Sequence, residues 1–165
     1  MNRWTASAAL VALTLGLAGA PAWAQGTGTF KYAEQVKLIT MDPQKQSGSG
    51  VPFLRPAYES LFEKGPNGEN VPLLATGYEV DGLNVNIALR QGVSFSNGEP
   101  FNAQAAAANI NRGVKLGIVE GLKTVDSAEA ADEFTLRIKL KEFDPAIINT
   151  LCYTGGMMIA PAVMD

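Results

Sequence analysis

The sequence contains no histidine and only one cysteine, Cys152. Without histidine, the chain has no imidazole for a catalytic triad, for general base catalysis or for binding a metal ion. A single cysteine forms no disulfide within the chain and no thiolate cluster for zinc. We therefore expect no cofactor, no metal site and no enzyme activity, a secreted hydrolase included. We interpret Cys152 as a small buried core residue.

Charged residues are also few. The 13 lysines and arginines form no cluster and are outnumbered by 16 aspartates and glutamates, which gives a net charge of −3. Proteins bind nucleic acids through concentrated positive charge, so we expect no nucleic-acid partner. Hydrophobic residues make up 47% of the chain, which is typical of a folded globular protein rather than a disordered one.

The N-terminus has the pattern of a secretory signal peptide. A positive start, Met1-Asn2-Arg3, is followed by the uncharged apolar stretch Trp4–Ala18 and by an A-x-A pattern that ends at Ala24. The apolar stretch is shorter than the roughly 20 residues that a membrane-spanning helix needs. We predict that residues 1–24 are cleaved off and that the protein is exported.

Alternating apolar residues predict antiparallel strands. Asn84–Leu89 and Phe134–Leu140 place a hydrophobic side chain at every second position, as a sheet with one buried face requires. Residues 125–130 precede an Asp-Glu turn and form the expected hairpin partner of the second strand. Gly65–Gly68 and Asp81-Gly82 predict two further tight turns.

Three stretches favour helices. Val51–Phe62 has a broad apolar face, although Pro56 would kink this helix or delay its start. The alanine-rich residues Ala103–Lys115 have high helix propensity, and Asn102 stands where an N-cap is expected. Asp144-Pro145 has the composition of a third helix start. The sequence thus predicts a mixed α/β (α+β) fold.

The residues from Leu89 to Ala103, LRQGVSFSNGEPFNA, form the most distinctive motif of the chain. They fit the pattern L-R-x-G-V-x-F-x-[DN]-G-x-P-F-[TND]-A and so resemble the signature of the family 5 extracellular solute-binding proteins, the peptide and nickel binders of ABC importers. Because no motif places a second acid near Glu59, we expect a structural hydrogen-bonding or exposed role for this residue. Shorter motifs also resemble this family: Met41-Asp42-Pro43, Tyr58-Glu59-Ser60-Leu61 and Pro72-Leu73-Leu74-Ala75.

The resemblance implies a fold class and a function. The fold would be the N-terminal lobe of a two-lobed periplasmic binding protein of the oligopeptide-binding type. Residues 25–165 would form a truncated domain, because complete family members are several times longer. The function would be that of a monomeric periplasmic receptor that captures a di- or oligopeptide and delivers it to the membrane permease of an ABC importer. A nickel chelate or another small solute is an alternative ligand, and a stand-alone secreted interaction domain is an alternative function.

The resemblance also implies where the ligand would lie. A polar, glycine-rich loop and a later segment that ends at Pro161 correspond to family segments that border the ligand. A solvated connection is the alternative interpretation of the loop, and core packing is the alternative for the later segment. The candidate ligand-binding residues are Gln46, Ser47, Gly50 and Val51 from the loop, and Tyr153, Thr154 and Met157 from the later segment.

Overall fold

A computed structural model describes residues 31, 35, 38–46 and 50–164 of the chain. The chain divides into two units, Met1–Ala33 and Glu34–Asp165. The fold described below is that of the second unit. The predicted signal peptide and the candidate ligand residue Ser47 lie outside the described residues.

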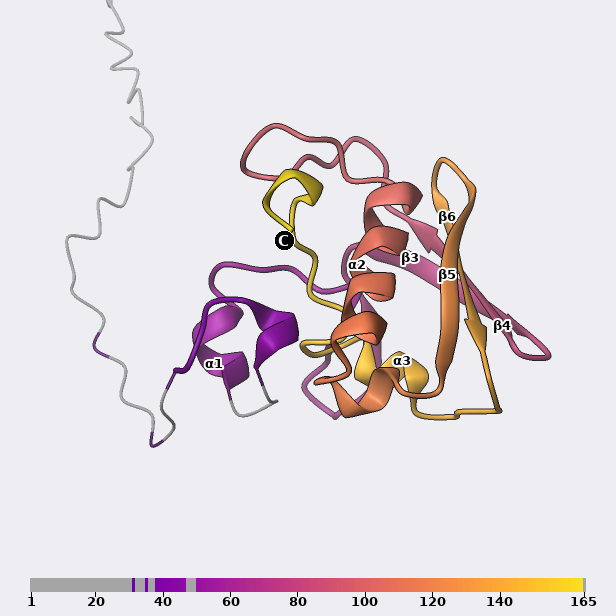
Figure 1. The fold of residues 1–165 in the computed structure, drawn as a ribbon, viewed down its shortest axis with the longest axis horizontal. Coiled ribbons are helices and arrows are strands. Elements are labelled where there is room, and N and C mark those ends of the chain that lie inside the picture. The colour runs from indigo at the N-terminus through magenta and orange to yellow at the C-terminus, as the bar shows by residue number, and fades with distance from the viewer. Residues whose placement is uncertain (1–30, 32–34, 36–37, 47–49, 165) are drawn as a thin grey trace, which may run out of the picture. The chain divides into compact units, whose positions relative to one another are not determined.

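Four antiparallel strands form the main sheet, in the order β3-β4-β6-β5 (Figure 1). In the centre of the sheet, Val85 pairs with Ile138 and Ile87 with Leu136. All four of these side chains are fully buried, because alternation directs them to the same face. Both predicted strands and the hairpin between residues 125 and 140 are confirmed. The strands are β3 (Ala75–Asp81), β4 (Asn84–Leu89), β5 (Val125–Asp132) and β6 (Thr135–Leu140).

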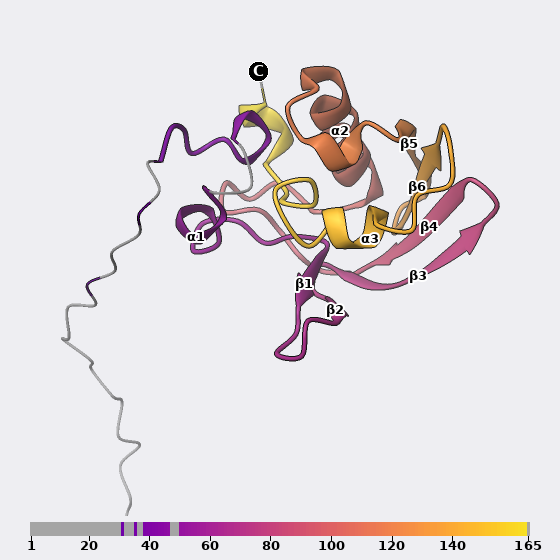
Figure 2. The same cartoon turned by 90° about the horizontal axis from the view of Figure 1, so that it is seen from below.

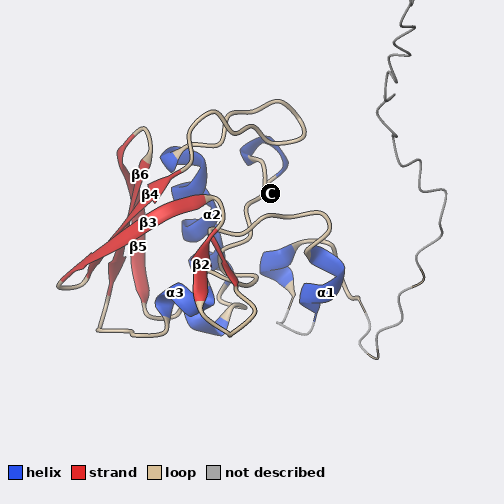
Figure 3. Cartoon of the chain, turned by 180° about the vertical axis from the view of Figure 1, so that it is seen from behind, coloured by secondary structure: helices blue, strands red, loops and turns tan. Residues whose placement is uncertain are grey.

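The helix α2 (Ala103–Leu116) covers the apolar face of this sheet (Figure 3). Asn102 caps it as predicted, since its side-chain oxygen accepts a 2.9 Å hydrogen bond from the Ala105 N–H. The residues of α2 that enter the core are mostly alanines, with Ile110 as the one large apolar side chain among them. Small side chains let the helix backbone lie close to the strands.

The smaller elements surround this pair of layers. A hairpin of β1 (Phe62–Lys64) and β2 (Asn70–Pro72) stands apart from the main sheet (Figure 2), and it confirms the predicted turn at Gly65–Gly68. Cys152 is fully buried in the main core, as predicted, and burial raises the pKa of its thiol. The remaining elements are η1 (Pro43–Lys45), α1 (Val51–Leu54), η3 (Glu120–Leu122), α3 (Ile147–Thr150) and η4 (Pro161–Val163).

The predicted helix Val51–Phe62 is wrong over most of its length. Only α1 (Val51–Leu54) is helical, and the strand β1 begins at Phe62. Pro56 explains the difference, because proline donates no backbone hydrogen bond and its ring collides with the carbonyl four residues earlier. The chain instead makes a turn in which the N–H groups of Ala57 and Tyr58 both bond the Leu54 carbonyl, at 2.9 and 3.0 Å.

The third helix start is also displaced from its prediction. The residue that caps α3 is Ala146, and the helix runs only from Ile147 to Thr150. Asp144 uses its carboxylate differently: it accepts hydrogen bonds from the Ala146 N–H and from the Thr124 hydroxyl, both at 2.8 Å. The side chain therefore ties two loops together before the helix begins.

The Asn102 cap gives a direct test of the α2 boundary. Replacing Asn102 by alanine removes the acceptor for the Ala105 N–H, and we expect the free energy of unfolding to fall by about 1 kcal/mol. Urea unfolding followed by circular dichroism measures this change. Asn102→Asp is the matched control, because a carboxylate keeps the acceptor. Equal stability of Asn102→Ala and wild type would contradict the assigned cap.

Candidate functional site

The two segments that the sequence singles out as ligand-facing meet in the structure. We call residues 38–46 and 50–54 the first segment and residues 153–159 the last segment. Val51 and Leu54 of the first segment form a buried apolar cluster with Met157 of the last, and Tyr58 and Tyr153 pack against it. Residues about 100 positions apart in the sequence thus form one surface.

Backbone pairing holds the last segment in place beside the turn that follows α1. Ser60 and Met157 form an isolated antiparallel bridge. On either side of it, the Leu61 N–H donates to the Gly156 carbonyl at 2.9 Å, and the Met158 N–H donates to the Glu59 carbonyl at 3.0 Å. The extended stretch that replaces the end of the predicted helix is therefore the partner strand of the last segment.

Gln46 folds back on its own segment. Its Oε1 atom accepts hydrogen bonds from the N–H groups of Ile39 and Thr40, both at 3.1 Å. Its Nε2 atom lies against Gly50, where a β-carbon would overlap it, and has no hydrogen-bond partner among the described residues. A buried donor without an acceptor costs about 1–3 kcal/mol, so this amide is a group that an added acceptor would stabilise.

Burial separates the candidate ligand residues from one another. Gln46, Gly50, Val51, Thr154 and Met157 are all buried, whereas Tyr153 is half-buried. Of the six candidates that the structure describes, only Tyr153 therefore offers a substantial side-chain surface to a molecule outside the fold.

Tight backbone packing fixes the turn that carries Tyr153. A β-carbon at Gly156 would overlap the carbonyl of Leu151, and one at Gly155 would lie 2.8 Å from a side-chain carbon of Thr150. Because these neighbours include backbone atoms, the turn has little freedom to relax around a larger residue.

An ion pair anchors the first segment to α2. The Arg112 guanidinium donates from Nη1 and Nη2 to the two carboxylate oxygens of Asp42, at 3.2 and 2.6 Å, and Asp42 also accepts from the Gln44 N–H at 3.0 Å. Burial acts to raise the pKa of Asp42. The hydrogen bonds from Arg112 and Gln44, with the charges of Arg112 and Lys45, outweigh it and hold the pKa below its ordinary value.

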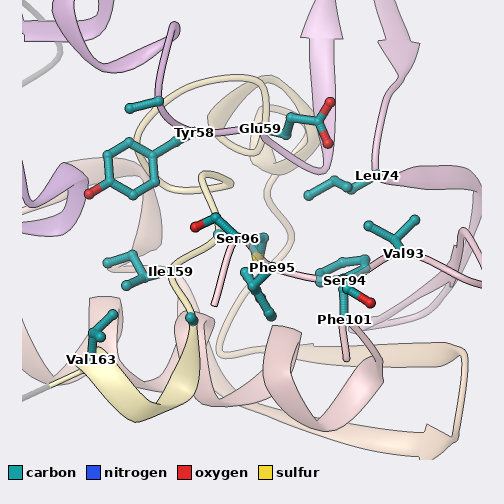
Figure 4. A pocket seen from close by; sticks show the side chains of 13 residues that line it. Tyr58, Glu59, Leu74, Val93, Ser94, Phe95, Ser96, Phe101, Ile159 and Val163 are labelled. Carbon is teal, nitrogen blue, oxygen red and sulfur yellow. The ribbon is translucent and has the colours of Figure 1, made fainter. Parts of the chain in front are cut away.

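A separate cavity lies under the loop of the family motif, Leu89–Ala103, which we call the signature loop (Figure 4). It has a volume of about 330 Å³. Within the loop, Ser94 pairs with Pro100, and Gly98 adopts a φ of 88° that favours glycine at the turn. The rings of Phe95 and Phe101 meet edge to face with centroids 5.9 Å apart. None of the six candidate ligand residues that the structure describes lines this cavity. The residues that do line it include Tyr58, Glu59, Val93, Phe95, Ile159 and Val163.

Asn109, at the centre of α2, is a structurally important polar residue that the sequence patterns above did not indicate. It is fully buried and bonded to the last segment. One signal was available, because Asn109 stands within the apolar face of the helix beside Ile110 and one turn after Ala105 and Ala106. A polar side chain at such a position has to find a hydrogen-bond partner inside the fold.

The described part of the chain has neither a cluster of metal-binding side chains nor a helix that could span a membrane. No group of three or more Cys, Asp or Glu side chains there could hold a metal ion. No helix there is long and apolar enough to cross a membrane.

Comparison with known proteins identifies the family. Residues 69–163 match the bacterial extracellular solute-binding proteins, family 5. This match includes the signature loop, α2 and the last segment. The chain belongs to this family.

The curated relatives include glutathione-binding proteins. The chain is similar to the glutathione-binding protein GsiB of Pectobacterium atrosepticum, with 28% identity over 170 residues that cover 99% of this chain and 32% of the relative. It is 30% identical to GsiB of Escherichia coli O6:K15:H31, over 100% of this chain and 34% of that protein. The chain therefore spans about a third of the length of the curated relatives that it matches.

Solved structures share the fold. The structure of NikA from Brucella suis in complex with Fe(III)-EDTA is similar with a TM-score of 0.64 and 28% sequence identity, over 76% of this chain and 24% of NikA. This confirms the predicted mixed α/β fold as part of a periplasmic binding protein of the oligopeptide and nickel type.

The packing at Gly156 predicts a large effect of one methyl group. Gly156→Ala would push against the Leu151 carbonyl, and we expect a loss of about 1–3 kcal/mol of unfolding free energy, measured by urea denaturation. Gly77→Ala is the control, because no atom lies within 4 Å of the added carbon. A Gly156→Ala protein as stable as the control would show that the turn relaxes more easily than its packing indicates.

The Asp42–Arg112 pair predicts a pH-dependent stability. Asp42→Asn keeps an acceptor for the Gln44 N–H but loses the ion pair, so we expect it to be less stable by about 1–3 kcal/mol at neutral pH. Because the folded-state pKa is lowered, this difference is complete above the unfolded pKa of about 3.9 and disappears as the pH falls through the folded value.

Urea unfolding of wild type and Asp42→Asn from neutral to acidic pH measures this difference. Asp126→Asn is the control, since Asp126 lies 3.8 Å from Lys139 on the surface and should change stability by no more than about 0.5 kcal/mol. A difference between Asp42→Asn and wild type that does not change with pH would contradict the ionised pair.

Proposed function

We propose that this chain supplies part of the ligand-binding lobe of a periplasmic receptor for an ABC importer, and that its ligand is a di- or oligopeptide. The observation that carries the proposal is the meeting of the first and last segments, which the family resemblance associates with the ligand. The receptor would be monomeric, would be exported by the N-terminal signal peptide and would pass its ligand to a membrane permease.

The curated relatives support a peptide ligand. The GsiB proteins are named for glutathione, which is itself a tripeptide, and the two described above align with 99% and 100% of this chain. The main chain of a peptide carries both hydrogen-bond donors and acceptors. The buried Nε2 donor of Gln46 would suit a peptide carbonyl or carboxylate, if the ligand reaches it.

Tyr153 is the side chain that we expect to contact the ligand. It is the half-buried member of the described candidates, and it packs against the apolar cluster of Val51, Leu54 and Met157 where the two segments meet. An aromatic ring with a hydroxyl group can cover an apolar side chain of the ligand and bond a polar group at once. Gln46, Gly50, Val51, Thr154 and Met157 would shape the wall behind it.

A metal chelate is the second candidate ligand. NikA from Brucella suis, which is similar in sequence and fold, was solved with Fe(III)-EDTA. A chelated metal needs few protein ligands of its own, so the lack of histidine in this chain does not decide between the two candidates.

Isothermal titration of the native protein, purified from the cells that make it, tests the proposal. The probes are glutathione, tri-alanine and the Ni(II) complex of L-histidine. We expect one of the peptides to bind with a Kd of about 1 μM or lower, and Tyr153→Ala to weaken that binding about tenfold. Phe143→Ala is the control, because this aromatic side chain is 70% exposed and lies outside both segments.

Each result has a distinct meaning. Binding of the nickel complex but of neither peptide would overturn the peptide proposal and favour the chelate. Peptide binding that is unchanged in Tyr153→Ala would keep the proposed ligand class and remove Tyr153 from the site.

A further inference from the structure

Helix α2 is bonded to the last segment by one buried side chain. The Nδ2 atom of Asn109 donates to the carbonyls of Ile159 and Ala105, at 2.9 and 3.0 Å, and its Oδ1 atom accepts from the Ile159 N–H at 2.9 Å. The amide thus pairs with both backbone groups of Ile159, as a neighbouring strand would. Asn109 is fully buried, so water does not compete for these bonds.

The same face of α2 is bonded to the first segment. Besides its pairing with Asp42, the Nη1 atom of Arg112 donates to Oε1 of Gln44 at 2.7 Å. Gln44 is fully buried, and its Nε2 atom donates to the backbone carbonyl of Asn109 at 2.8 Å. A continuous series of hydrogen bonds therefore runs from Asp42 through α2 to Ile159.

We propose that Asn109 and Arg112 are positioning residues that hold the first and last segments at one fixed spacing through their shared attachment to α2. Figure 1 shows α2 with the sheet on one side and the first segment on the other. The inference rests on the proposed function, since it assigns these residues to the binding surface that the two segments form. It adds that the surface is preorganised by a helix that does not itself contact the ligand.

A preorganised binding surface raises ligand affinity because less conformational entropy is lost on binding. A segment that is already fixed loses little conformational freedom when a ligand binds, whereas a loosened segment must be ordered at the expense of affinity. Removing the Asn109 amide leaves both backbone groups of Ile159 without their side-chain partner. The last segment should then sample more arrangements, and Tyr153 should be presented less consistently.

Asn111 provides a matched control on the same helix. Its Nδ2 atom donates to the Ala128 carbonyl at 2.7 Å, and its Oδ1 atom accepts from the Ala128 N–H at 2.8 Å. It therefore bonds both backbone groups of one residue, as Asn109 does, but on the edge strand β5, which belongs to neither segment. The two residues differ in burial, since Asn111 is exposed, whereas Asn109 is fully buried and also bonds the Ala105 carbonyl. Asn111→Ala and Asn109→Ala delete the same chemical group from one helix.

The first experiment compares ligand binding by these variants. Glutathione is titrated into native wild type, Asn109→Ala and Asn111→Ala at a temperature where circular dichroism shows all three to be folded. We expect Asn109→Ala to bind about tenfold more weakly and Asn111→Ala to bind within about twofold of wild type. Wild-type affinity of Asn109→Ala, or equal weakening of both variants, would overturn the proposal.

A second experiment needs no ligand. Hydrogen exchange followed by NMR reports the protection of the Ile159 amide in wild type, Asp42→Asn, Arg112→Gln and Asn111→Ala. We expect Asp42→Asn and Arg112→Gln to lower this protection severalfold, although the bonds of Asp42 and Arg112 described above do not involve Ile159. We expect Asn111→Ala to leave the protection unchanged.

The two experiments separate this inference from the proposed function. If wild type binds neither glutathione nor tri-alanine, the peptide proposal fails, and exchange at Ile159 still decides whether the segments are coupled through α2. If wild type binds and Ile159 protection is the same in all variants, the coupling is wrong and the function stands.

Discussion

The close packing of α2 against the sheet is the constraint on which the other parts of this unit depend. Alanines on the buried face bring the helix backbone near the strands, so the few polar side chains on it reach neighbouring backbone groups directly. Asn109, which is fully buried, meets the last segment in this way, whereas Asn111, which is exposed, bonds the edge strand β5. A buried amide without partners is costly, so the bonds of Asn109 limit the path of the last segment.

The hydrogen bonds from α2 position the two segments that make up the candidate binding surface. Its side chains are mostly buried against one another, and Tyr153 is the partly open member. The glycines of the last segment allow backbone atoms to approach where any side chain would collide. Recognition at such a surface would depend on backbone geometry and one aromatic ring more than on many flexible side chains, which suits a ligand with a repeated main chain.

Family membership indicates the fold of this chain but not its ligand. Relatives named for glutathione and a relative solved with a metal chelate share this lobe, so the lobe alone does not select the solute. In this chain the scaffold consists of the signature loop with its edge-to-face Phe95 and Phe101 rings, the capped helix α2 and the central strands β4 and β6. Fold and function are separate inferences, and the ligand has to be argued from the site.

The sequence by itself determined the local elements. Alternating apolar residues predicted β4 and β6, and Asn102 predicted the start of α2. The signature motif indicated the family. Each of these patterns depends on residues that are close together in the chain. The predicted helix does not continue beyond Leu54, because Pro56 interrupts it and because Glu59–Leu61 pair with a segment about 100 residues away. Tertiary structure alone decided that the two candidate ligand-binding segments meet, that most of their candidate side chains are buried, and that Asn109 and Arg112 bond them to α2. Those contacts join residues far apart in sequence, and no local pattern specifies which distant backbone group will satisfy a buried amide or guanidinium.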